Sequence, residues 1–140
     1  MPYSDPQDLA DRYLAPWTEP DATARRQAVE RLWAESGTHV LHPPAEIRRI
    51  AAELGFDQPT LEARGHDAVE TRMARSHERF VAKGGLTFRP VATAVRMGNV
   101  VKFHWETVEP GSGQVLGRGL VVLVLDGEDR ISTDYMFPGD

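Results

Sequence analysis

Two side chains in the first third of the chain have the chemistry of proton-transfer groups. His42 precedes Pro43-Pro44 and a predicted short helix, and the dipole at a helix start disfavours a positively charged imidazole. A neutral imidazole with an ordinary pKa of about 6.5 can accept a proton at physiological pH. Tyr13 lies on the apolar face of the first predicted helix. Each also has a structural alternative: His42 as a helix cap or cavity wall, and Tyr13 as a core residue bonded to the backbone.

Helical patterns that would position these groups fill the first 82 residues. Asp5-Pro6 is typical of a helix start, and Leu9, Tyr13 and Trp17 then follow at a spacing of four. Asp21 can cap a second helix, which Gly37 would end. The remaining patterns predict a short strand over 38–41, a short amphipathic helix over 47–54, a loop over 56–64 and a long helix over 66–82.

After residue 85 the hydrophobic period changes from 3.6 to 2, which predicts strands over 86–95, 100–109, 114–126 and 130–137. Helices followed by hairpin-linked strands indicate an α+β fold with an antiparallel sheet. In the last strand we expect Tyr135 and Phe137 to face the cavity and Asp134 to face away. The alternative phase would make Asp134 an acid in the pocket. The strand over 114–126 is apolar on both faces near its end, which favours an oligomer interface.

Composition limits the functions that this chain can have. The 140 residues fit a single domain spanning 1–140. The net charge of −5 disfavours nucleic-acid binding, and no apolar run is long enough for a membrane span. The chain has no cysteine and does not begin like a signal peptide, so we expect a cytoplasmic protein. No metal-ligand spacing or phosphate-binding glycine loop occurs, and we expect no metal and no cofactor.

Several motifs, taken in order, resemble the SnoaL-like branch of the nuclear transport factor 2-like (NTF2-like) superfamily, over residues 8–137. The pieces are Arg12-Tyr13-Leu14 with Trp17, Leu32-Trp33-Ala34, Thr38-His39-Val40-Leu41-His42-Pro43, Arg64-Gly65-His66-Asp67-Ala68-Val69, the tryptophan strand 100–106, and Asp129-Arg130-Ile131 before Tyr135 and Phe137. The resemblance implies a cone-shaped curved sheet wrapped by three N-terminal helices plus a short inserted helix. It also implies a homodimer through the outer sheet face. The segment 44–64 would add a lid or an extra wall.

The resemblance to ketosteroid isomerase within this superfamily implies roles for both candidates. His42 replaces the aspartate that acts there as general base, and Tyr13 matches the tyrosine that donates to a developing oxyanion. The second donor position falls at Val121, which cannot donate. The epoxide hydrolase branch, with its Asp–Arg–Asp set, is an alternative for which Arg118 and Asp134 could supply two members. A surface salt bridge between them is the simpler interpretation.

Two function classes therefore remain open. The first is an acid–base isomerase, cyclase or dehydratase acting on a small hydrophobic substrate, with His42 as base and Tyr13 as donor. The second is a non-catalytic module for ligand binding or dimerisation. For either class the predicted pocket is lined by mostly aromatic residues: Trp17, Trp33, His77, Phe88, Phe103, Trp105, Val121, Tyr135 and Phe137.

Overall fold

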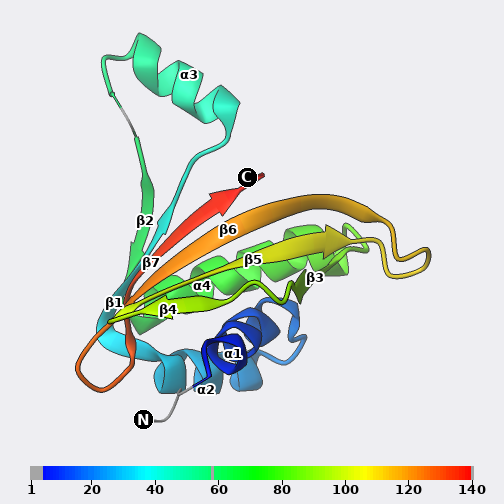
Figure 1. Ribbon diagram of the computed structural model, residues 1–140. Helices are drawn as coiled ribbons and strands as arrows, with labels where there is room; N and C mark the ends of the chain where they lie inside the picture. The colour runs from blue at the N-terminus through cyan, green and yellow to red at the C-terminus, as the bar shows by residue number, and fades with distance from the viewer. Residues whose placement is uncertain (1–4, 58, 140) are drawn as a thin grey trace.

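The strands after residue 85 join two strands from the N-terminal half in one curved, unclosed sheet (Figure 1). This computed structural model describes residues 5–57 and 59–139. The strand order is β2-β1-β7-β6-β5-β3, and β4 pairs with β5. The strands are β1 (Trp33–Leu41), β2 (Leu61–Arg64), β3 (Thr87–Pro90), β4 (Val95–Met97), β5 (Val100–Val108), β6 (Val115–Leu125) and β7 (Ile131–Pro138).

The predicted α+β fold is confirmed, with one difference in the sheet. Every described strand pair is antiparallel except β1 and β7, which run parallel, so the sheet is mixed. The predicted loop over 56–64 is wrong at its end, because β2 (Leu61–Arg64) pairs there with β1. Four residues are too short a run to show a period that distinguishes strand from loop.

The described residues also form four helices and a π-helical turn: α1 (Pro6–Thr18), α2 (Ala22–Leu32), α3 (Ala45–Glu53), α4 (His66–Ser76) and η1 (His77–Ala82). The predicted caps are present, since the Asp5 side chain accepts from the Gln7 N–H and that of Asp21 accepts from the Ala24 N–H. Helix α2 ends at Leu32 rather than near Gly37, because β1 already begins at Trp33.

The hydrophobic core lies between the inner face of the sheet and helices α1, α2 and α4. Leu9, Tyr13 and Trp17 are buried on the inner side of α1, as their spacing predicted. From the strands, the apolar residues at less than 1% exposure are Trp33, Val101, Phe103, Val121, Leu123 and Ile131. Helix α3 has no buried residue and stands apart from this core at the end of the arm formed by β1 and β2 (Figure 1).

A β-bulge reverses the predicted phase of the last strand. Ile131 pairs with Leu125 while Thr133 pairs with Val124, which leaves Ser132 as an extra residue between them. The alternation shifts by one there, so Asp134 is fully buried while Tyr135 and Phe137 are 40% and 36% exposed. The prediction that Tyr135 and Phe137 face the cavity is therefore wrong. The alternative phase, with Asp134 on the inner face, holds.

Candidate functional site

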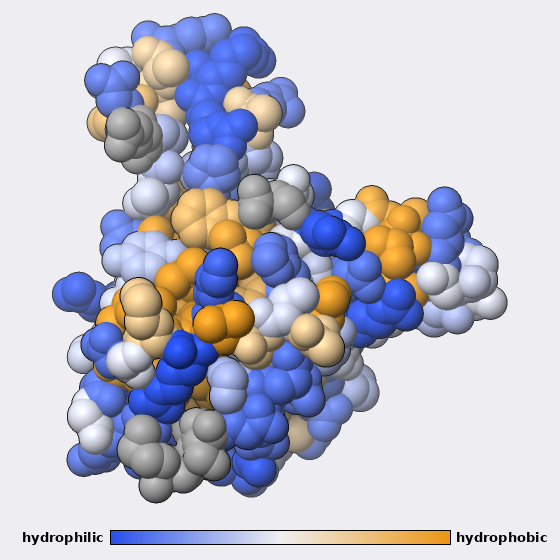
Figure 2. All heavy atoms as spheres, in the orientation of Figure 1, coloured by the Kyte–Doolittle hydropathy of each residue, from blue (hydrophilic) through white to orange (hydrophobic). Residues whose placement is uncertain are grey.

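The concave side of the sheet encloses a pocket of about 600 Å³. Its walls come from α1, α4 and η1, from β1, β2, β3, β5, β6 and β7, and from the start of the α3 arm. The lining residues are largely apolar: Leu14, Trp17, Leu41, Pro44, Ile47, Leu61, Phe80, Leu86, Phe88, Trp105, Leu116, Gly117, Met136 and Pro138, with His39, His42, Arg72, Ser76, Arg79 and Thr107 as the polar members. Pro44, Ile47 and Leu61 make the 44–64 segment an extra wall. Figure 2 shows α3 set apart above a partly hydrophobic surface.

A cluster of buried polar side chains lies at the inner end of this pocket. The Tyr13 hydroxyl donates to Asp134 Oδ2 at 2.5 Å, and His39 Nε2 lies 3.7 Å from the same oxygen. On the other side of the imidazole, Arg72 Nη1 is 2.9 Å from His39 Nδ1. The four residues come from α1, β1, α4 and β7, so only the complete fold brings them together.

The hydrogen bonds of Arg72 determine the tautomer of His39. A guanidinium only donates, so Nδ1 of His39 must accept, and its proton must be on Nε2, facing Asp134. Arg72 Nη1 also donates to the carbonyl oxygens of His39 and Leu61. These bonds fix the arginine to β1 and the start of β2, and hold the imidazole in one orientation.

Burial dominates the protonation of the cluster. It raises the pKa of Asp134 well above the usual 3.8, against the opposing effects of the Tyr13 hydrogen bond and the Arg72 charge. Burial and Arg72 together lower the pKa of His39 to about 3. Burial, followed by the nearby Asp134, raises the pKa of Tyr13 well above 10. The contact between His39 and Asp134 therefore joins an uncharged imidazole to a carboxyl group that favours its neutral form.

The pocket wall exposes only part of this cluster. His39 and Arg72 line the pocket, whereas Tyr13 and Asp134 lie behind them and do not. Asp134 Oδ1 is buried with no hydrogen-bond partner among residues 5–57 and 59–139, and the same holds for His39 Nε2. Unpartnered buried polar atoms are uncommon in folded proteins and call for an explanation.

The structure separates the two proposed catalytic residues. His42 lines the pocket, but its side chain is exposed at the rim, beside the ring of Phe137. Arg48 Nη1 lies 2.9 Å from its Nε2. Tyr13 instead lies in the buried cluster, bonded to a carboxyl group and not to the backbone. The two side chains therefore do not form one buried acid–base pair.

Of the predicted lining residues, Trp17, Phe88 and Trp105 lie on the pocket wall. Trp33, Phe103 and Val121 are fully buried core residues away from it. His77 is half-buried on η1 and does not line it. Tyr135 and Phe137 are on the opposite face of the sheet, as the bulge explains.

Sequence reasoning did not select His39, Asp134 and Arg72 as site residues. His39 is 1% exposed on the inner face of β1, together with Trp33. The predicted strand began at residue 38 and β1 is irregular between Trp33 and Thr38, so the sequence offered no continuous alternation that would place His39. Arg118, the predicted partner of Asp134, is instead 3.6 Å from Glu106 at the surface, so the expected Arg118–Asp134 pair is not formed.

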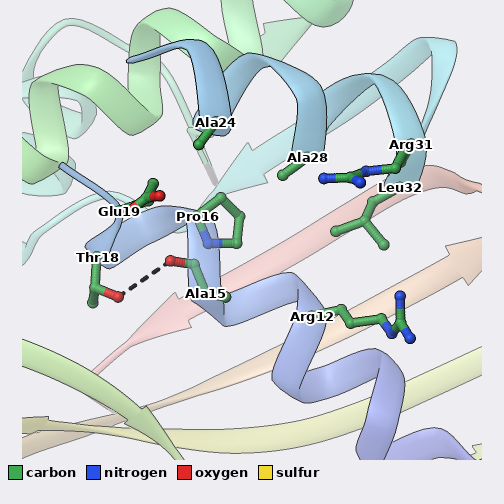
Figure 3. Close-up of a pocket in the computed structure, with 9 residues that line it drawn as sticks. All are labelled: Arg12, Ala15, Pro16, Thr18, Glu19, Ala24, Ala28, Arg31 and Leu32. Carbon is green, nitrogen blue, oxygen red and sulfur yellow. Dashed lines mark hydrogen bonds between the residues drawn. The ribbon is translucent and has the colours of Figure 1, made fainter. Parts of the chain in front are cut away.

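A second hollow of about 420 Å³ lies on the outer side between α1 and α2 (Figure 3). Its walls are Arg12, Ala15, Pro16, Thr18, Glu19, Ala24, Ala28, Arg31 and Leu32. The Thr18 hydroxyl there donates to the Ala15 carbonyl, which is local helix-end bonding. This hollow contains no cluster of buried titratable groups, so the candidate site is the pocket inside the cone.

In the part of the chain that the structure describes, no three histidine or carboxylate side chains come close enough to hold a metal ion. No helix in residues 5–57 or 59–139 is long and apolar enough to cross a membrane.

Comparison with solved structures identifies the architecture. A SnoaL-like family protein from Agrobacterium tumefaciens strain C58, provisionally assigned as an isomerase, is 24% identical over 96% of this chain and 97% of its own, with a TM-score of 0.76. The chain has the SnoaL-like fold. A SnoaL-like protein of unknown function from Burkholderia thailandensis E264 is 16% identical over 96% of this chain and 95% of its own, with a TM-score of 0.60.

The broader NTF2-like group matches as well. An NTF2-like protein of unknown function from Mesorhizobium loti is 15% identical over 96% of this chain and 90% of its own, with a TM-score of 0.61. No protein-family model matches the chain, and no curated protein is similar enough in sequence to match. The predicted SnoaL-like architecture is therefore confirmed, and these likenesses establish the fold alone.

Proposed function

We propose that this SnoaL-like chain is an acid–base enzyme that moves a proton on a small, largely apolar carbonyl compound bound in the 600 Å³ pocket. This places it in the isomerase, cyclase or dehydratase class. The provisional assignment of the Agrobacterium tumefaciens protein as an isomerase agrees with this class.

The observation that carries the proposal is the buried carboxyl group of Asp134 behind the pocket wall. A fully buried carboxyl costs stability unless its neutral form prevails or partners compensate. Its raised pKa means that this carboxyl holds its proton at pH values where a free carboxyl has lost it, as a general acid requires. Such perturbed groups next to a pocket are typical of functional sites.

The residues of the cluster take different roles in this proposal. Asp134 exchanges the proton, and the Tyr13 hydroxyl stabilises the charge that remains on the carboxylate. His39 is the member of the cluster on the pocket wall that contacts Asp134, so a ligand reaches Asp134 only when the imidazole breaks its bond to Arg72 and turns aside. His42 at the rim is the second assignment for the base. Three residues of extended chain span roughly 10 Å, so a bound molecule can contact both histidines.

An exchange experiment tests the proposal even though the product of the reaction is not identified. A panel of small apolar ketones is incubated with the protein in D₂O, and loss of the α-proton signals is followed by NMR. We expect at least one ketone to exchange faster with the wild type. The Asp134→Asn variant should lose at least about 100-fold of this acceleration, in the range of general acid–base catalysis.

Matched variants make the outcome decisive. Tyr135→Phe alters an exposed tyrosine on the outer face and should exchange like the wild type, whereas Tyr13→Phe should be slower. If His42→Ala lost the acceleration of exchange and Asp134→Asn kept it, the base would be His42 and not Asp134. Equal exchange in all variants, or none for any ketone that binds, would refute the enzyme.

A non-catalytic binding module is the second candidate. The observation that favours it is that Tyr13 and Asp134 are absent from the pocket wall, so the cluster would serve only to hold α1 against β7. Binding of a ketone without exchange would support it. An epoxide hydrolase is a weaker alternative, because Asp134 has Arg72 near it but the described residues bring no second aspartate beside them.

We also propose that the chain is one cytoplasmic domain spanning 1–140 that forms a homodimer through the outer sheet face. Support comes from an apolar patch of Leu120, Val122, Val124, Tyr135 and Phe137, none of which is fully buried. In sedimentation velocity, the wild type should have twice the monomer mass and Tyr135→Lys should be a monomer. Ile50→Lys, on exposed α3, is the control. A monomeric wild type would contradict the dimer.

A further inference from the structure

The charges on the pocket wall differ in sign from those of the whole chain. The chain carries 21 acidic and 16 basic residues, a net charge of −5. Among residues 5–57 and 59–139, the pocket wall includes Arg72, Arg79 and two histidines but no aspartate or glutamate. The rest of the lining is apolar apart from two hydroxyl groups. A wall of this composition is complementary to a molecule with an apolar body and an anionic group.

Arg72 has guanidinium nitrogens that the described part of the chain leaves without a hydrogen-bond partner. All of its hydrogen bonds to the protein are made by Nη1, which contacts His39 and the Leu61 carbonyl. Its Nε and Nη2 atoms have no hydrogen-bond partner among the described residues. These two N–H groups form the side of the guanidinium that binds a carboxylate through two parallel hydrogen bonds. The arginine is thus held by one nitrogen and presents the other two.

No carboxylate neutralises either arginine. Among residues 5–57 and 59–139, no aspartate or glutamate lies within ion-pair distance of Arg72 or Arg79. The Arg79 guanidinium lies only over the Phe80 ring, 5.3 Å from its centre. The carboxyl group of Asp134 acts electrostatically on Arg72. Burial raises the pKa of Asp134, however, and so limits the negative charge on that carboxyl group.

The two arginines lie on one continuous helical segment but differ in their burial. Arg72 is half-buried on α4, and Arg79 is exposed on η1, about two helical turns or roughly 10 Å further along. Arg72 is therefore suited to hold the anionic group, and Arg79 to attract it at the entrance. A single ligand does not need to touch both.

We propose that the ligand of this pocket is an apolar carboxylic acid whose carboxylate binds Nε and Nη2 of Arg72. This deepens the proposed function and rests on it, since it names the substrate class of the same site. The carboxylate would satisfy both free donors, and the aromatic walls from Trp17, Phe88 and Trp105 would enclose the apolar body.

Isothermal titration calorimetry with three matched probes tests this inference: 2-naphthylacetate, its primary amide, and 2-(2-naphthyl)ethylamine. The three share one apolar body and differ in charge. We expect the wild type to bind the carboxylate at least about tenfold more tightly than the amide, and the amine most weakly. Raising the salt concentration should weaken the carboxylate alone.

Three arginine variants test which side chain produces the preference for the carboxylate. Arg72→Lys keeps the charge but loses the two-pronged donor, and should lose most of the preference for carboxylate over amide. Arg79→Gln should weaken carboxylate binding several-fold and reduce its salt dependence. Arg75→Gln, which removes an exposed arginine of α4 that does not line the pocket, is the control and should bind like the wild type. Thermal unfolding of each variant verifies that it is folded.

The outcomes separate this inference from the proposed function. Equal or tighter binding of the amide overturns the inference, and α-proton exchange with neutral ketones would leave the enzyme standing. Carboxylate preference without any exchange removes the enzyme and keeps the ligand class. A preference that survives Arg72→Lys and Arg79→Gln together overturns the assigned site. Failure of all three probes to bind overturns the inference, and the exchange experiment with neutral ketones then decides the proposed function separately.

Discussion

Replacing Asp134 with asparagine tests the protonation of the buried cluster through the pH dependence of stability. The folded chain keeps a proton on Asp134 at pH values where the unfolded chain, with a pKa near 3.8, has lost it. In that window stability falls as the pH rises. Asparagine has no proton to lose, and its side-chain oxygen can still accept from Tyr13, so the variant should lack this fall.

His39 contributes with the opposite sign. Its pKa is about 3 in the folded chain and about 6.5 in the unfolded chain, so between these values only the unfolded chain holds the proton. In that range His39 adds stability as the pH rises, and this contribution is complete above pH 6.5. Between about pH 3.8 and 6.5, and below the raised pKa of Asp134, the two pH dependences cancel, because folding takes up one proton at Asp134 and releases another at His39.

The magnitude follows from the linkage relation. One proton corresponds to about 1.4 kcal/mol for each pH unit. From pH 4.5 to 6.5 the free energy of unfolding of Asp134→Asn, relative to wild type, should therefore rise by up to about 3 kcal/mol. His39→Gln, relative to wild type, should fall by about the same amount. Asp134 is not among the causes of the His39 shift, so the asparagine leaves the His39 contribution in place.

Urea unfolding followed by tryptophan fluorescence at pH 4.5, 5.5, 6.5 and 7.5 measures these differences. Using differences between variants removes the contributions of all other titrating groups. Equal slopes of stability against urea concentration would verify that the unfolded states are comparable. A constant difference between Asp134→Asn and the wild type across the range would refute a protonated Asp134. If the stability difference from wild type changed with pH in the same direction for both variants, the opposing contributions of Asp134 and His39 would be refuted.

Further substitutions test the packing around the pocket by urea unfolding. Tyr13→Phe should cost about 1–3 kcal/mol, because a buried carboxyl oxygen loses its donor, while Tyr135→Phe on the exposed face should stay within about 0.5 kcal/mol. Gly119→Ala should cost about 1–3 kcal/mol, since its Cβ would lie 2.3 Å from Cζ2 of Trp105. Gly117→Ala, with no neighbour within 4 Å, should stay within about 1 kcal/mol. Equal losses within either pair would contradict the corresponding contact.

Local patterns predicted the elements because each pattern is contained in a few residues. The spacing of Leu9, Tyr13 and Trp17 follows from helix geometry and identified the buried face of α1. The caps at Asp5 and Asp21 likewise act on their own helix ends. The long helix was predicted over 66–82, and the chain is helical over that range, although the last turn is π-helical.

The site could not be predicted in the same way, because it depends on register. One extra residue at Ser132 decides whether Asp134 or Tyr135 faces the core, and the Ser132 hydroxyl donates to the Val124 carbonyl across the bulge. No periodicity in a strand of eight residues reveals such an insertion. The hydrogen bond from Tyr13 joins residues 121 positions apart. The parallel pairing of β1 with β7 then sets His39 opposite Asp134.

The bulge also explains why a carboxyl group is buried where an apolar side chain would be more stable. Without the extra residue, Tyr135 would take the inner phase, and its hydroxyl and ring would be buried in place of the acid. The chain instead buries Asp134 and leaves two aromatic residues at the surface, which costs stability on both faces of β7. A fold that required only a core gains nothing from this arrangement. A pocket that requires a proton-exchanging group behind His39 does, and the asymmetry of β7 is therefore the strongest structural argument for chemistry at this site.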